Sequence, residues 1–109
     1  MQGITNKKVL ITAGATGIGK ATAIAMMNAG AQVHVCDINT QALADFKQDY
    51  PLLFTSVTNV AEPDEVAVMF AQLQQDFDGK LDFLVNNAGV SGPAGPIETL
   101  DIEAWKATF

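Results

Sequence analysis

A glycine-rich segment directly after a short apolar run constrains the fold more than any other feature of the sequence. Residues 12–19 read T-A-G-A-T-G-I-G and follow Lys8 to Thr12 (KVLIT), which has no polar alternation. Such a run is typical of a strand buried on both faces of a parallel sheet. From Gly17 to Ala29 the spacing becomes helical, and Gly30 is a suitable C-terminal stop. This order predicts the opening unit of a parallel α/β sheet.

The rest of the chain repeats the alternation of strand and helix. The expected elements are a strand over 31–37, a helix over 40–50, a strand over 52–57, a helix from Pro63 to Gly79 and a strand over 81–87. A further helix is expected to begin at Asp101. We therefore predict one α/β domain over residues 1–109, a doubly wound parallel sheet of about four strands within three α/β/α layers.

Apolar spacing predicts which face each helix buries. In the first helix we expect one apolar side, formed by Ile18, Ala21, Ile24, Ala25 and Ala29. In the helix after Pro63, apolar residues repeat at i, i+4, i+7 and i+11: Val66, Phe70, Leu73 and Phe77. The Gly/Pro-rich stretch over 91–96 is expected to be a loop. The fourth strand would then be a bare edge of the sheet.

Composition excludes several classes of protein. The chain has 109 residues, a net charge of −6 and 49% hydrophobic residues, which indicates a packed core. Twelve acidic against six basic residues, with no basic cluster, argue against nucleic acid or an anionic membrane as partner. One cysteine, Cys36, suits a reducing compartment, and no segment has the length of a signal peptide core or a membrane span. We expect a cytoplasmic protein.

The glycine turn has the chemistry of a phosphate site. At the carboxyl edge of a parallel sheet, backbone N–H groups and the positive end of a helix can hold a pyrophosphate, which side chains would block. We expect Gly17 and Gly19 to be close-contact positions, one against a ligand and one against the neighbouring strand. Thr22 stands where a G-x-G-x-x-G motif would have its third glycine, so a different dinucleotide turn is implied. The alternative is a tight turn without a ligand.

Asp37 points to the choice of dinucleotide. It ends the second expected strand, where a carboxylate can accept hydrogen bonds from a ribose 2′-hydroxyl and would repel a 2′-phosphate. No Arg or Lys stands at Thr16, Ile38 or Asn39 to bind such a phosphate. The residues therefore favour NAD over NADP. The alternative is that Asp37 caps the following helix.

Two motifs together resemble one family. Residues 12–19 resemble the TGxxxGxG turn of the classical short-chain dehydrogenases/reductases, and N-N-A-G at 86–89 resembles the second signature of that family. Between these two motifs, N-V-A-E-P-D-E-V (59–66) is similar to the family's D-V-x-D-P-x-x-V stretch. After them, Leu100 and Trp105 are similar to the family's L-x-x-x-x-W segment. The resemblance covers the family's amino-terminal half and implies a Rossmann-type fold that binds NAD(P).

The resemblance implies roles for twelve residues. Those implied to bind the cofactor are Gly14, Thr16, Gly17, Ile18, Gly19, Asp37, Ile38, Asn59, Val60, Asn87, Ala88 and Gly89. The turn residues would line the pyrophosphate and the adenosine ribose, and Asn59 with Val60 would flank the adenine. Asn59 keeps an acceptor oxygen where the family usually has Asp. Residues 87–89 would run behind the nicotinamide ribose, or N-N-A-G could simply be a strand-end turn held by Asn side chains.

Catalysis is where the chain departs from the family pattern. The family's catalytic Asn, Ser, Tyr and Lys lie beyond N-N-A-G, and Tyr50, the only tyrosine, has Phe54 rather than Lys four residues later. We assign no catalytic residue and no metal ligand. The complete protein is expected to be an oxidoreductase that moves hydride between nicotinamide and an alcohol or carbonyl substrate, and to form a homo-oligomer; the chain alone is expected to be inactive. The alternative is a non-catalytic dinucleotide-binding or partner-binding module.

Two other side chains suggest structural roles. His34 lies in the second expected strand without a second His or Cys at ligand spacing, so a packed or solvent-facing residue is expected rather than a metal ligand. Asp76 is expected to be a solvated residue near a helix end.

Overall fold

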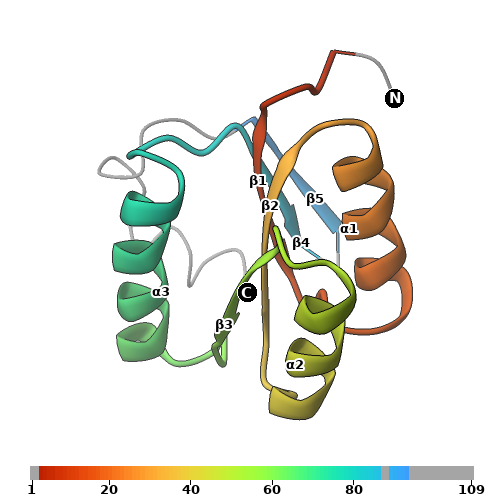
Figure 1. The fold of residues 1–109 in the computed structure, drawn as a ribbon. Coiled ribbons are helices and arrows are strands. Elements are labelled where there is room, and N and C mark those ends of the chain that lie inside the picture. Colours follow the sequence, from red (N-terminus) through yellow and green to blue (C-terminus); the bar gives the residue numbers. More distant parts are fainter. Residues whose placement is uncertain (1–2, 87–88, 94–109) are drawn as a thin grey trace.

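The computed structural model describes residues 3–86 and 89–93, which alternate between strand and helix up to the fourth strand (Figure 1). The elements are β1 (Lys8–Thr12), α1 (Gly17–Asn28), β2 (Gln32–Asp37), α2 (Thr40–Asp49), β3 (Phe54–Val57), α3 (Pro63–Asp76), β4 (Phe83–Asn86) and β5 (Gly89–Pro93). The predicted elements up to residue 86 are confirmed, and their boundaries differ by at most two residues except at the end of α3, which stops at Asp76, three residues before Gly79. The expected helix at Asp101 lies outside the described residues.

The strands form one sheet in the order β3-β2-β1-β4-β5. The first four are parallel, with Leu10 of β1 opposite His34 of β2 and Leu84 of β4. The chain starts in the middle of the sheet, moves outward to β3 and then crosses to β4. This crossing makes a topological switch point beside β1, where open α/β sheets bind ligands. The predicted doubly wound sheet is confirmed.

Helices cover both faces of the sheet (Figure 1). Alternate strand residues enter two cores: Val9, Ile11, Val33 and Val35 pack with the side of α1 and α2, while Leu10 and Cys36 pack with α3. The four predicted apolar positions of α3, together with Met69, are buried in the second core. These cores hold the carboxyl ends of the strands, and with them the predicted site, in one place.

The expected apolar side of α1 is wrong in part. Ile18 is 79% exposed, and Ala21 and Ala25 are exposed as well. Gly19 and Ala23 are the buried residues of this helix. The small buried face lets the helix axis approach the sheet closely, whereas the larger apolar side chains lie around its margin. Hydrophobic spacing could not distinguish the two sides, because apolar residues surround most of the helix.

The expected bare edge at β4 is also wrong. Residues 89–93 form β5, which includes the beginning of the expected loop. This strand runs antiparallel to β4, with Phe83 opposite Pro93 and Asn86 opposite Gly89. The unpaired N–H and C=O groups of a sheet edge will pair with any chain that lies alongside in an extended conformation, even one rich in glycine. The proline stands at the end of the strand, where its missing N–H costs least.

Candidate functional site

The carboxyl edge of the parallel strands brings the predicted cofactor-binding residues together. The turn after β1, Asp37 at the end of β2 and Asn59 just beyond β3 all follow carboxyl ends of parallel strands, which meet at one edge. Gly89 begins β5, where its backbone pairs with Asn86. The other two predicted residues, Asn87 and Ala88, lie outside the described residues.

The turn itself is tightly packed against the sheet. The backbone N–H of Gly14 donates to the Cys36 carbonyl at 3.3 Å, and a Cβ on Gly14 would lie 2.7 Å from the Val35 side chain. A Cβ on Gly19 would lie 2.5 Å from the Ala13 carbonyl oxygen. Gly14 is therefore the glycine that packs against the neighbouring strand. Gly19 packs against the turn, which corrects the expectation made for it.

Ala13 stands where the resembling family has the first glycine of its motif. Its φ of 51° lies in the left-handed region, which costs a residue with a Cβ about 1 kcal/mol or more. The backbone therefore keeps the bend that glycine would adopt without strain. Alanine in place of the family's glycine therefore raises the energy of the turn, while residue 13 still adopts a left-handed backbone conformation.

Gly17 and the start of α1 form the part of the turn that is open to a ligand. Gly17 has a φ of 59°, and a Cβ placed on it would meet nothing within 4 Å. Thr16, the N-cap residue, makes no side-chain hydrogen bond to the helix, and the first turn of α1 has no acidic residue. By contrast, Asn39 caps α2 by accepting from the Ala42 N–H at 3.0 Å. The positive end of α1 thus has no counter-charge of its own, which suits an anionic ligand.

Asp37 is held beside this turn. One carboxylate oxygen accepts the Ala15 N–H at 3.1 Å and the other accepts the Asn39 N–H at 3.0 Å. The alternative that Asp37 caps α2 is wrong, because Asn39 does so. A carboxylate has about four acceptor positions, so two further hydrogen bonds from a ribose remain available. The link to Ala15 was missed from the sequence, since a contact across 22 positions leaves no periodic signal.

Exposed apolar side chains flank the acidic residue. Ile18, in the first turn of α1, is 79% exposed, and Ile38, the residue after Asp37, is 69% exposed. On the third loop the Asn59 side-chain oxygen accepts the Ala61 N–H at 3.0 Å, and Glu65 accepts the Asn59 N–H. Val60 is half-buried and packs against the core beneath α3. The loops at this edge therefore carry two exposed apolar side chains and a carboxylate, the residue types that suit an adenosine.

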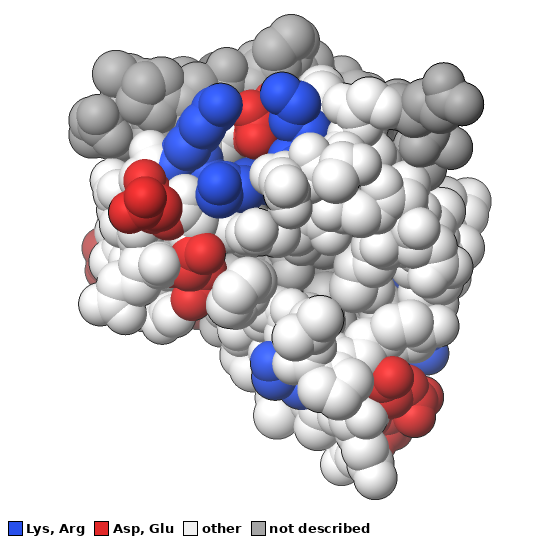
Figure 2. All heavy atoms as spheres, turned by 45° about the horizontal axis from the view of Figure 1, so that its top comes forward, with Lys and Arg blue, Asp and Glu red and all other residues white. Residues whose placement is uncertain are grey.

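Positive charge gathers at the opposite edge of the sheet. Lys7, Lys8 and Lys80 surround Asp82 near the amino end of β1, and the view from that end shows the basic side chains around an acidic one (Figure 2). Burial raises the pKa of Asp82, but the backbone N–H of Lys8 and the nearby ammonium groups outweigh it, and the pKa is lowered. These charges neutralise Asp82 and lie away from the glycine turn.

The described residues also bear on metal binding, on a membrane span and on the reactivity of two side chains. Within residues 3–86 and 89–93 no group of three or more His, Cys, Asp or Glu side chains could hold a metal ion, and no helix is long and apolar enough to cross a membrane. Burial raises the pKa of Cys36 to about 12, so this thiol stays protonated and serves as a packed side chain. Tyr50 packs edge-on against Phe46, with ring centroids 5.5 Å apart.

The parallel strands β1 to β4, the helices on both faces and the glycine-initiated helix at the carboxyl edge define a Rossmann-type α/β domain. The family model described as "short chain dehydrogenase" matches residues 7–109. The chain belongs to this family. It is 35% identical over 107 residues to a short chain dehydrogenase/reductase of Colletotrichum higginsianum, covering 94% of this chain and 40% of the relative.

Other relatives are similar over the same region. A cyclohexanol dehydrogenase of Acinetobacter sp. is 34% identical over 105 residues, covering 93% of this chain and 41% of the relative. A short chain dehydrogenase from Bacillus anthracis, of known crystal structure, is 27% identical with a TM-score of 0.69, covering 75% of this chain and 35% of that one. The chain thus spans about two fifths of the length of these two curated relatives.

Proposed function

We propose that the chain is the cofactor-binding half of an NAD-dependent oxidoreductase. The observation that carries the proposal is the pairing of the open, positive start of α1 with the Asp37 carboxylate, which is held 3.1 Å from the Ala15 N–H of the same turn. The pyrophosphate would lie over Gly17 and Ile18, where a Cβ on Gly17 would enter the free space. The adenosine ribose would lie against Asp37, with Ile38 and Asn59 beside the adenine.

NAD supplies hydride transfer at its nicotinamide ring. The described residues would bind and orient the dinucleotide so that this ring lies beyond the carboxyl end of β4. The substrate is proposed to be a small alcohol or carbonyl compound, in keeping with the name of the related cyclohexanol dehydrogenase. Tyr50, the only tyrosine of the sequence, is packed on Phe46, so we do not propose it as the residue that exchanges the substrate proton. We propose that the complete protein is cytoplasmic and homo-oligomeric.

Calorimetric titration with NAD and NADP tests the cofactor assignment. We expect NAD to bind at least about tenfold more tightly, a difference of about 1.4 kcal/mol, because Asp37 would face the 2′-phosphate of NADP at short range. Asp37→Ala should narrow this ratio. Asp45→Ala, which removes an exposed carboxylate on α2, is the matched control and should leave the ratio unchanged. Equal affinities of the unmodified protein for the two dinucleotides would refute the role of Asp37.

A further inference from the structure

A chain of polar side chains joins α3, β2 and β3 on the face of the sheet that α3 covers. The His34 Nε2 lies 2.8 Å from the Ser56 Oγ, and the His34 Nδ1 lies 3.3 Å from a carboxylate oxygen of Asp76. His34 is fully buried and the Asp76 side chain is only 13% exposed. Of the two roles expected for His34, packed or solvent-facing, the structure shows the packed one, whereas the solvated role expected for Asp76 is wrong.

The contacts of His34, Ser56 and Asp76 indicate which of their atoms carry protons. Asp76 beside Nδ1 favours the tautomer that carries its proton on Nδ1, although the 3.3 Å contact is not aligned as a hydrogen bond. Nε2 is then an acceptor for the Ser56 hydroxyl. The Thr58 hydroxyl donates to the Ser56 Oγ at 3.1 Å, so it does not compete for Nε2. Gln72 donates to the other Asp76 oxygen at 3.0 Å and holds the carboxylate in place.

Burial keeps the base neutral. Desolvation lowers the pKa of His34 to about 4 and outweighs the opposing effect of Asp76, the ionisable side chain in contact with the ring. Phe77 also packs edge-on against the imidazole, at a centroid distance of 6.4 Å. An imidazole that is neutral at pH 7 and within 2.8 Å of a hydroxyl has a free lone pair for its proton, and Asp76 beside Nδ1 would stabilise the charged ring that results.

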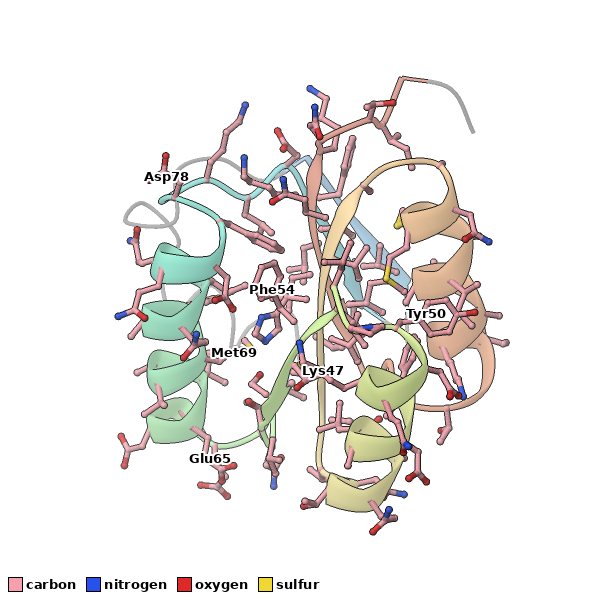
Figure 3. The ribbon with its side chains drawn as sticks, in the orientation of Figure 1. Lys47, Tyr50, Phe54, Glu65, Met69 and Asp78 are labelled. Carbon is pink, nitrogen blue, oxygen red and sulfur yellow. The ribbon has the colours of Figure 1, made fainter. Side chains whose placement is uncertain are left out.

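Ser56 lies partly at the surface, whereas His34 is buried beneath it. It is half-buried and lines a cleft of about 420 Å³ between β3 and α3. Val57 and Val68, which are 56% and 72% exposed, supply apolar walls, and Asp64 and Glu65 line the cleft as well. Figure 3 shows Met69 facing the sheet from the middle of α3 and Glu65 at the end of that helix where β3 finishes. A small apolar molecule without negative charge suits this cleft.

Backbone donors also face this edge. β3 lies at the end of the described sheet, and the Thr58 N–H donates inward to the Asp37 carbonyl at 2.9 Å. Because successive N–H groups of a strand point to opposite sides, the Val57 N–H faces outward, next to Ser56. An outward N–H beside a nucleophile is the type of donor that stabilises an oxyanion.

We propose that Ser56 is a nucleophile for acyl transfer from small uncharged or cationic esters, with His34 as its general base and Asp76 as a positioning residue. The Ser56 Oγ bonds to the ester carbonyl carbon while its proton passes to the His34 Nε2. The bond to the leaving alcohol then breaks, and Nε2 returns the proton to that alcohol. Water releases the acid from Ser56 by the same two steps. This activity is independent of the dinucleotide site proposed above.

Labelling with a fluorophosphonate-biotin probe, followed by mass mapping, tests the proposal. The sequence has two serines, so Ser91→Ala is a matched control for Ser56→Ala. We expect one adduct per chain, located on Ser56, that is lost in Ser56→Ala and kept in Ser91→Ala. An adduct elsewhere, or no adduct under conditions that label a serine esterase, would overturn the proposal.

Two further variants separate an activated serine from one that is merely accessible. We expect the labelling rate to fall about 100-fold or more in His34→Gln and roughly tenfold in Asp76→Asn. Unchanged rates in folded variants would refute the roles of these residues. If circular dichroism shows that both variants are unfolded, 4-nitrophenyl acetate with the unmodified protein decides: a burst of one nitrophenolate per chain and an acetyl group on Ser56 support the proposal, and their absence refutes it.

Discussion

Mild acid should destabilise the folded chain, and His34 should be the cause. The pKa of His34 is about 4 in the folded chain, against 6.5 for an ordinary histidine, because burial disfavours the charged ring. The unfolded chain therefore binds a proton first as the pH falls. The stability that His34 contributes is complete above the unfolded pKa and is lost as the pH falls from there towards the folded pKa.

The size of this effect follows from the two pKa values. Linkage gives a loss of about 1 kcal/mol between pH 7 and pH 5.5, growing to roughly 3 kcal/mol below pH 4. Asp82, whose pKa is lowered, adds a loss of the same sign, but at lower pH, where its carboxylate is protonated. The sequence has one histidine, so the interval from pH 7 to pH 5.5 isolates His34 from the other side chains.

Urea unfolding at a series of pH values measures the effect. The unmodified protein should lose about 1 kcal/mol of unfolding free energy over this interval, whereas His34→Gln, although less stable overall, should show an almost flat profile. The slope is the relevant quantity, because it does not depend on the packing cost of the substitution. Parallel profiles for the two proteins would refute the assignment of a neutral buried imidazole.

Two further predictions concern the glycine turn. Ala13→Gly should raise the free energy of unfolding by about 1 kcal/mol, because it removes a Cβ from a residue with a φ of 51°; an unchanged or lower denaturation midpoint would contradict the strain. Gly17→Ala should cost about 1 kcal/mol of stability, because alanine is strained at a φ of 59°, and no more than that, because the added Cβ would meet nothing within 4 Å. The same substitution should weaken NAD binding tenfold or more in calorimetry; undiminished affinity would show that no ligand approaches this position.

Local patterns predicted most of the secondary structure. The run K-V-L-I-T corresponds to β1 over Lys8–Thr12, and the apolar repeat after Pro63 corresponds to the buried side of α3. Both signals arise within a few residues, because strand and helix periodicities depend on near neighbours. Parallel pairing then follows, since short helical connections return each strand in the same direction.

The candidate site was predictable only in part. The glycine turn and Asp37 are recognisable because a dinucleotide site requires these residue types near the ends of the first two strands. Which glycine packs against which neighbour was not predictable: a Cβ on Gly14 meets Val35, and one on Gly19 meets Ala13. Such contacts depend on the distance between strand and turn in space, which spacing along the chain does not determine.

The sequence by itself determined the class of fold, the glycine turn and the acid beside it, because each depends on residue type within a short stretch. Tertiary structure alone decided that residues 89–93 pair with β4 and that Asp76, His34 and Ser56 meet. His34 and Ser56 are 22 positions apart, on neighbouring strands, and Asp76 comes from the helix above them. Packing of that helix on the sheet brings the three together, and no local pattern records it.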